Sequence, residues 1–99
     1  MTSTETWDLT ISTPIGKIKA DIDLREQDGI WSGIARGSGE DVELRDLVRD
    51  GNRITWRQAI TRPMRLNLVF EVTVDGDDLK GTSKAGRLPS SKVVGRRRL

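Results

Sequence analysis

The chain has 99 residues and a formal net charge of +2, enough for one domain with a modest core. Charged residues make up 32% and hydrophobic residues 34%, and no apolar run reaches the roughly 18 residues of a membrane-spanning helix. Cys, His and Tyr are absent, which excludes disulfides, thiolate or imidazole metal sites and His-based triads. We expect a single soluble domain over residues 1–99 without a cofactor. The lack of a secretory signal at its start predicts a cytoplasmic location.

Apolar and polar residues alternate along most of the chain. Trp7, Leu9 and Ile11 have polar neighbours, and the same pattern recurs over residues 18–24, 54–60 and 66–74. A period of two is typical of strands with one buried face. The expected strands are 5–13, 17–25, 29–36, 41–49, 53–61, 65–75, 78–84 and 91–98.

Glycine-containing turns separate these segments. Asp28-Gly29, Asp50-Gly51-Asn52 and Asp75-Gly76-Asp77 have the composition of tight hairpins. The remaining turns are expected at 14–16, 37–39, 62–64 and 86–89. Hairpin links throughout predict an antiparallel meander, and eight strands can close into a barrel without exposed edges. We therefore predict an all-β fold, an eight-stranded antiparallel up-and-down barrel.

The order of these motifs resembles the calycin-like small β-barrels, the group that contains lipocalins and avidin-like proteins. The matching pieces are Trp7 on the first strand, the segment 28–33, the turns 50–52 and 75–77, and the closing Gly-Arg-Arg at 95–97. They are most similar to short bacterial lipocalin-like domains. The glycine that precedes the first-strand Trp of lipocalins is missing, and there is no room for their lid loops. The resemblance implies an interior that binds small apolar ligands, with Trp7 packed against Arg97 to plug one end.

The interior of such a barrel is either filled by side chains or holds one small ligand. Gln58 is informative because it shares its face with Ile54, Trp56 and Ile60. A buried amide needs hydrogen bonds, so Gln58 either orients a ligand or bonds within the protein. The residues that would form the apolar wall, or else fill the core, are Trp31, Trp56, Met64, Leu68 and Phe70.

Basic residues gather at the end of the predicted barrel opposite the Asp-Gly hairpins. Arg62 and Arg65 flank Pro63 and Met64 there. An arginine at the mouth of an apolar interior can hold a ligand carboxylate through two parallel hydrogen bonds. The alternative is that both arginines belong to an ordinary solvated loop.

Two carboxylates are candidates for general acid–base chemistry. Asp46 shares the phase of Leu44 and Val48 if its strand is regular, which would point it into the barrel. A bulge after Leu44 would instead turn Asp46 outward and bury Leu47, and we favour the bulge because Leu47 also needs burial. Glu71 is the second candidate.

Charge is unevenly distributed. Residues 79–99 carry seven Lys and Arg and no acid, whereas residues 1–78 carry 10 basic and 15 acidic residues. A basic terminal segment is a candidate nucleic-acid arm, but no aromatic residue for base stacking follows Phe70. We therefore expect these charges to face acidic residues on neighbouring strands, and we expect no nucleic-acid partner.

Our leading interpretation is a barrel that binds a small, mainly apolar molecule, with or without a carboxylate. The first alternative is a cofactor-free cyclase, isomerase or lyase, in which Asp46 or Glu71 acts as acid or base and Gln58 polarises the substrate. The second is a barrel with a filled core that serves as an interaction module. Outward Val69 and Ala59 would then contribute to a homodimer contact.

Overall fold

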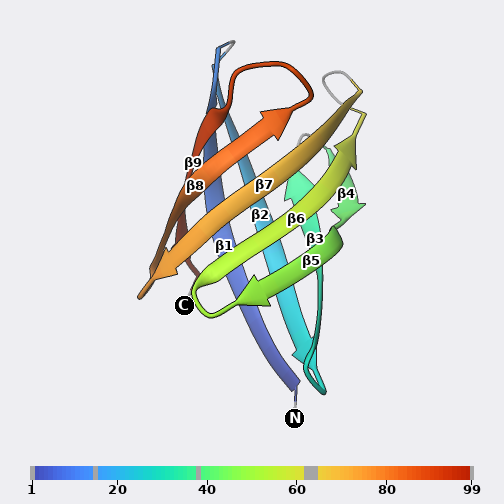
Figure 1. The fold of residues 1–99 in the computed structure, drawn as a ribbon, viewed down its shortest axis with the longest axis vertical. Coiled ribbons are helices and arrows are strands. Elements are labelled where there is room, and N and C mark those ends of the chain that lie inside the picture. Colours follow the sequence, from blue (N-terminus) through green and yellow to red (C-terminus); the bar gives the residue numbers. More distant parts are fainter. Residues whose placement is uncertain (1, 15, 38, 62–64, 99) are drawn as a thin grey trace.

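The computed structural model describes residues 2–14, 16–37, 39–61 and 65–98. Within these ranges the chain forms an elongated antiparallel barrel of 40 × 23 × 23 Å (Figure 1). No helix in the described residues is long and apolar enough to cross a membrane. The strands are β1 (Thr2–Thr13), β2 (Gly16–Gln27), β3 (Ile30–Gly37), β4 (Glu40–Glu43), β5 (Arg45–Asp50), β6 (Arg53–Ile60), β7 (Leu66–Asp75), β8 (Asp78–Ala85) and β9 (Ser91–Arg97).

The strands form one sheet in the order β4-β3-β2-β1-β9-β8-β7-β6-β5. It consists of two meanders, β1 to β4 and β5 to β9, joined where β1 pairs with β9. The two edge strands of the sheet, β4 and β5, follow each other in the chain. The sheet therefore curls back on itself and is nearly closed (Figure 1). The all-β, up-and-down arrangement expected from the alternation is confirmed.

The number of strands differs from the prediction: nine are present in place of eight. The segment expected as one strand, 41–49, is interrupted at Leu44, whose buried side chain and amide bond to the Gly33 carbonyl (2.9 Å) anchor it to β3. β4 pairs with β3, whereas β5 pairs with β6. The other seven expected strands are present within three residues of their predicted ends.

The predicted bulge lies within β5, directly after this break. The β5–β6 register shifts between Arg45 and Val48, and Asp46 takes a positive φ of 52°. Asp46 consequently faces solvent, while Leu47 packs against the core. The extra residue reverses the facing of the residues that follow it in the strand, which is why Leu47 and not Asp46 faces the interior.

The half of the barrel nearest the Asp-Gly hairpins is densely filled. Trp7, Trp56 and Phe70 are almost completely buried there. Gly81 has no room for a side chain, because a Cβ at this position would lie 2.6 Å from the Cα of Val72 on the adjacent strand. The backbones of β7 and β8 therefore approach closely at this position.

Candidate functional site

The opposite half of the barrel contains a cavity of about 310 Å³. It lies at the end where the β1–β2, β3–β4, β6–β7 and β8–β9 connections meet, and loop residues Pro14, Leu88 and Pro89 border its mouth. The remaining lining residues are Ile11, Thr13, Ile18, Ala20, Ala35, Arg36, Gly37, Glu40, Val42, Gln58, Ile60, Leu66, Leu68, Ser83, Ala85 and Ser91.

Small inward-facing residues create this cavity. Ala20 on β2, Ala35 on β3, and Ser83 and Ala85 on β8 all line it. Their side chains cannot reach across a barrel whose circumference is set by strand number and stagger. The wall expected from the sequence did not include these four residues, because it was drawn from large apolar side chains. The available signal was the run of small residues in the inward phase near one set of turns.

Gln58 is the most informative polar residue of the cavity. Its Oε1 accepts a hydrogen bond from the indole Nε1 of Trp56 at 2.9 Å. An indole nitrogen can only donate, so this bond fixes which end of the amide faces Trp56. The Nε2 group, with two N–H donors, points away from the indole, and Gln58 is part of the cavity wall.

Ser83 is a second polar residue of the cavity lining. Its side chain is 4% exposed, and its hydroxyl forms no side-chain hydrogen bond with any described residue. Ser83 pairs with Phe70 across β7–β8, and Phe70 pairs with Trp56 across β6–β7. This residue therefore lies at the level of the stacked aromatic rings, at the floor of the cavity.

The predicted wall residues separate into two groups. Gln58 and Leu68 line the cavity. Trp56 and Phe70 lie one inward-facing layer deeper, where their rings stack with centroids 4.8 Å apart and planes at 7°. Trp31 is near the closed end, beneath Arg49. Trp56 and Phe70 fill the core, which is the alternative left open by the sequence, and Trp31 is half-buried against it.

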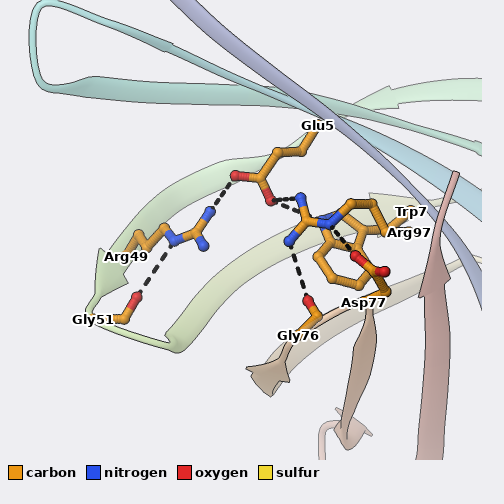
Figure 2. Close-up of polar contacts among 7 residues, drawn as sticks. All are labelled: Glu5, Trp7, Arg49, Gly51, Gly76, Asp77 and Arg97. Carbon is orange, nitrogen blue, oxygen red and sulfur yellow. Dashed lines mark hydrogen bonds and ion pairs between the residues drawn. The ribbon is translucent and has the colours of Figure 1, made fainter. Parts of the chain in front are cut away.

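The closed end is plugged by a charged cluster (Figure 2). The Arg97 guanidinium lies over the Trp7 ring, 4.4 Å from its centroid, as the resemblance implied. The Glu5 carboxylate binds both Arg97 (3.0 Å) and Arg49 (2.6 Å), and Arg49 lies 4.8 Å from the centroid of Trp31. The cluster joins β1, β3, β5 and β9 and closes this end to solvent.

The ionisation of Glu5 reflects this environment. Burial opposes the charged form, but the hydrogen bond and charge of Arg49, the hydrogen bond from Trp7 and the charge of Arg97 outweigh it. Together they hold the pKa of Glu5 below its ordinary value of 4.5. The carboxylate therefore stays ionised and serves as the counter-ion of two inward arginines.

The sequence predicted Arg62 and Arg65 at the mouth of the cavity, and the structure describes only the second of them. Arg62 and Met64 lie outside the described residues. Arg65 is exposed, and it is not part of the described cavity lining. Arg36 does line the cavity, but its guanidinium lies 3.0 Å from Asp21 and 2.7 Å from Asp23, the residues across the ladder on the outer face of the barrel.

The two candidate catalytic carboxylates are on the outside of the barrel. The Asp46 side chain is 78% exposed and lies 3.8 Å from Arg57. Glu71 is 56% exposed and forms a 2.5 Å ion pair with Arg53. The carboxylate that the structure brings to the cavity lining is Glu40, which accepts hydrogen bonds from the Thr61 amide (2.9 Å) and hydroxyl (2.8 Å). Among the described residues, no three carboxylates gather into a potential metal site.

The basic C-terminal segment is partly neutralised by neighbouring strands. Arg96 lies 3.8 Å from Asp78. Arg98 binds Asp8 and lies 3.1 Å from Asp21. The arginine between them belongs to the closed-end cluster. For these three arginines the expected pairing with acidic residues is confirmed.

Comparison with known proteins identifies no similar protein. No family model matches the chain, and no curated protein or solved structure is significantly similar to it. The nearly closed antiparallel barrel is compatible with a calycin-like fold. The function must therefore be argued from the geometry of the cavity.

Proposed function

We propose that the chain binds one small, mainly apolar molecule in the cavity at the open end of its barrel. The observation that carries this proposal is a mainly apolar space of about 310 Å³ whose polar lining residues include Gln58 and Ser83. Small-molecule sites are typically concave, mostly apolar and marked by a few placed polar groups, with volumes of about 300–1,000 Å³. This cavity is at the small end of that range, which favours a compact ligand.

Blocking the mouth tests the proposal. Ala85 lines the cavity at the end of β8, so Ala85→Phe would place an aromatic ring in it. Ala59 is exposed on the outer face of β6, and Ala59→Phe makes the same exchange outside the barrel. The probe is N-phenyl-1-naphthylamine, a neutral molecule whose fluorescence rises in apolar surroundings.

We expect the wild type and Ala59→Phe to bind one probe per chain with the same affinity. Ala85→Phe should bind at least about tenfold more weakly, because the probe loses the space that desolvates it. Circular dichroism confirms that both variants are folded. Equal binding by all three proteins would place the probe on the surface and overturn the proposal, as would no binding by the wild type.

Native mass spectrometry of protein purified gently from its host gives an independent test. A bound mass of a few hundred daltons, one per chain, would support the proposal, and fragmentation would begin to identify the ligand. The same spectrum reports the oligomeric state. A ligand-free dimer whose cavity also rejects the probe would favour an interaction module, for which the outer face offers Val69 at 46% exposure.

A further inference from the structure

We infer that the ligand of this cavity is an uncharged apolar molecule with a hydrogen-bond acceptor, such as a carbonyl or ether oxygen, at its buried end. This inference rests on the proposed function and deepens it, because it states which chemical class the site selects. The groups that carry it are the Gln58 amide and the Ser83 hydroxyl.

The Gln58 amide has its NH₂ donors left for a ligand. Its Oε1 is occupied by Trp56 Nε1, and Trp56 itself is 1% exposed and held by stacking on Phe70. The amide is thus fixed by a rigid core residue, with its NH₂ group turned from the indole. No hydrogen bond to a described residue occupies the Nε2 donors. Fixed donors in an apolar site favour a ligand acceptor, because unpaired they lose the hydrogen bonds that water would supply.

Ser83 adds a second polar contact at the floor. Ser83 is 4% exposed. Its hydroxyl has no side-chain partner among the described residues. Gln58 is on β6 and Ser83 on β8, so only β7 separates the two strands. Both groups thus belong to one sector of the wall. By strand pairing, Ser83 is level with Phe70 and Trp56, and Gln58 is one inward-facing layer nearer the mouth, level with Leu68 and Ala85.

The charges of the described lining residues favour a neutral ligand. Arg36 is their one cation, and its guanidinium binds Asp21 and Asp23 on the outer face. Glu40 brings a carboxylate to the lining near Thr61. A ligand carboxylate would therefore enter an apolar space without a described cation available to pair with it, and burying an unpaired charge is strongly unfavourable. The sequence allowed a ligand with or without a carboxylate, and these charges favour the ligand without one.

Three naphthalenes of matched shape test this selection. 2-Acetylnaphthalene carries a carbonyl acceptor, 2-isopropenylnaphthalene replaces the carbonyl oxygen by a CH₂ group, and 2-naphthoate is an anion. Each competes with N-phenyl-1-naphthylamine, or is titrated calorimetrically if the dye does not bind. We expect the ketone to bind about tenfold more tightly than the alkene. The naphthoate should bind at least about 100-fold more weakly than the ketone.

Two variants identify the groups responsible. Gln58→Glu, assayed at a pH at which the new carboxyl group is ionised, retains an oxygen to accept from Trp56 Nε1 but has no donor, so the preference for ketone over alkene should disappear. Ser83→Ala is nearly isosteric and should reduce that preference by a factor of about three. The alkene reports whether each variant keeps a functional cavity, because it needs neither donor.

The outcomes separate this inference from the proposed function. Equal affinities for ketone and alkene in the wild type, or tighter binding of naphthoate, would overturn the inference while leaving an apolar binding site. An unchanged preference in Gln58→Glu would overturn the role of the amide. Binding of none of the three compounds or the dye would overturn the proposed function itself.

Discussion

The two ends of this barrel are built from the same strands but from opposite kinds of interior residue. At the closed end, Trp7 and Arg97 meet over a Glu5 carboxylate, and large rings leave no space. At the open end, positions of the same inward phase hold Ala85 and Ala20, and a cavity remains. The difference teaches that the packed half supplies most of the stability, whereas the hollow half is the part that the proposed function uses.

The interface between the halves is formed by the Trp56–Phe70 stack. One side of the stack belongs to the packed core. On the other side, the Trp56 indole N–H donates a hydrogen bond to Gln58, which lines the cavity. A binding group held by the core loses little conformational freedom when a ligand arrives. The four predictions below test how different the two halves are, beginning with the largest expected effect.

Removing a ring from the packed half should cost the most stability. We expect Phe70→Ala to lower the free energy of unfolding by about 3–5 kcal/mol, because it removes a buried ring and leaves a void. Leu68→Ala, two residues away on the same strand, should cost less than about 2 kcal/mol, because Leu68 already borders a cavity. Chemical denaturation measures both, and equal losses would contradict the difference between the halves.

Adding atoms should reveal the same asymmetry. Gly81→Ala on β8 would push a Cβ against the backbone of β7, and we expect a loss of about 3 kcal/mol. Ala85→Leu, four residues along the same strand, adds more atoms but fills empty space, so stability should change by less than about 1 kcal/mol. Thermal melts followed by circular dichroism provide the measurement. A larger loss in Ala85→Leu than in Gly81→Ala would mean that the open end is not hollow.

The charged plug predicts a specific pH dependence. The pKa of Glu5 is lowered in the folded state, so its contribution is complete above the ordinary value of 4.5 and is lost as the pH falls through the lower folded-state value. Glu5→Gln leaves Arg49 and Arg97 without their shared counter-ion. We expect it to cost about 2 kcal/mol at neutral pH, below the 3–5 kcal/mol of fully buried pairs because the plug borders solvent.

Denaturant melts of wild type and variant at several pH values measure this effect. The difference between the two proteins should shrink as the pH falls. A difference that is constant with pH would show that the Glu5 charge is not what holds the plug. Asp77→Asn provides the control, because Asp77 is 55% exposed in its pair with Arg97 and its loss should matter much less.

The smallest effect is expected outside the barrel. Glu71→Gln breaks an exposed pair with Arg53 and should change stability by less than about 0.5 kcal/mol. Binding of N-phenyl-1-naphthylamine should be unchanged, because Glu71 does not line the cavity. A marked loss of probe binding would show that the outer face takes part in the site and would revive the catalytic interpretation of this carboxylate.

The strands and turns were predictable because alternation and Asp-Gly pairs are local signals. The outward Asp46 was also predictable, since Leu47 competes with it for the interior. The division of the expected strand 41–49 into β4 and β5 was not predictable, because it depends on which strand each half pairs with. Leu44 binds Gly33, a residue 11 positions earlier in the chain, and no local pattern specifies this contact.

The candidate site was predicted only in part for a similar reason. Alternation correctly placed Trp56, Gln58 and Phe70 inside the barrel. Alternation does not say how far along the barrel axis each inward-facing residue lies, because that position depends on the stagger of all the strands together. Trp56 and Phe70 therefore entered the expected wall, although they form the layer beneath it. The small residues that define the cavity are marked only by their position in the inward phase near one set of turns.

The pairing of β1 with β9 has a consequence for the speed of folding. Each meander is a series of hairpins between neighbouring segments, whereas the contact of Arg97 with Glu5 spans 92 positions of the chain. Loops this long are entropically expensive to close, so we expect the hairpins to form early and the β1–β9 ladder to limit the folding rate. Until that ladder forms, β1 and β9 are both free edges that can pair with another molecule. The cavity draws its walls from both meanders, and it comes into existence only at this last step.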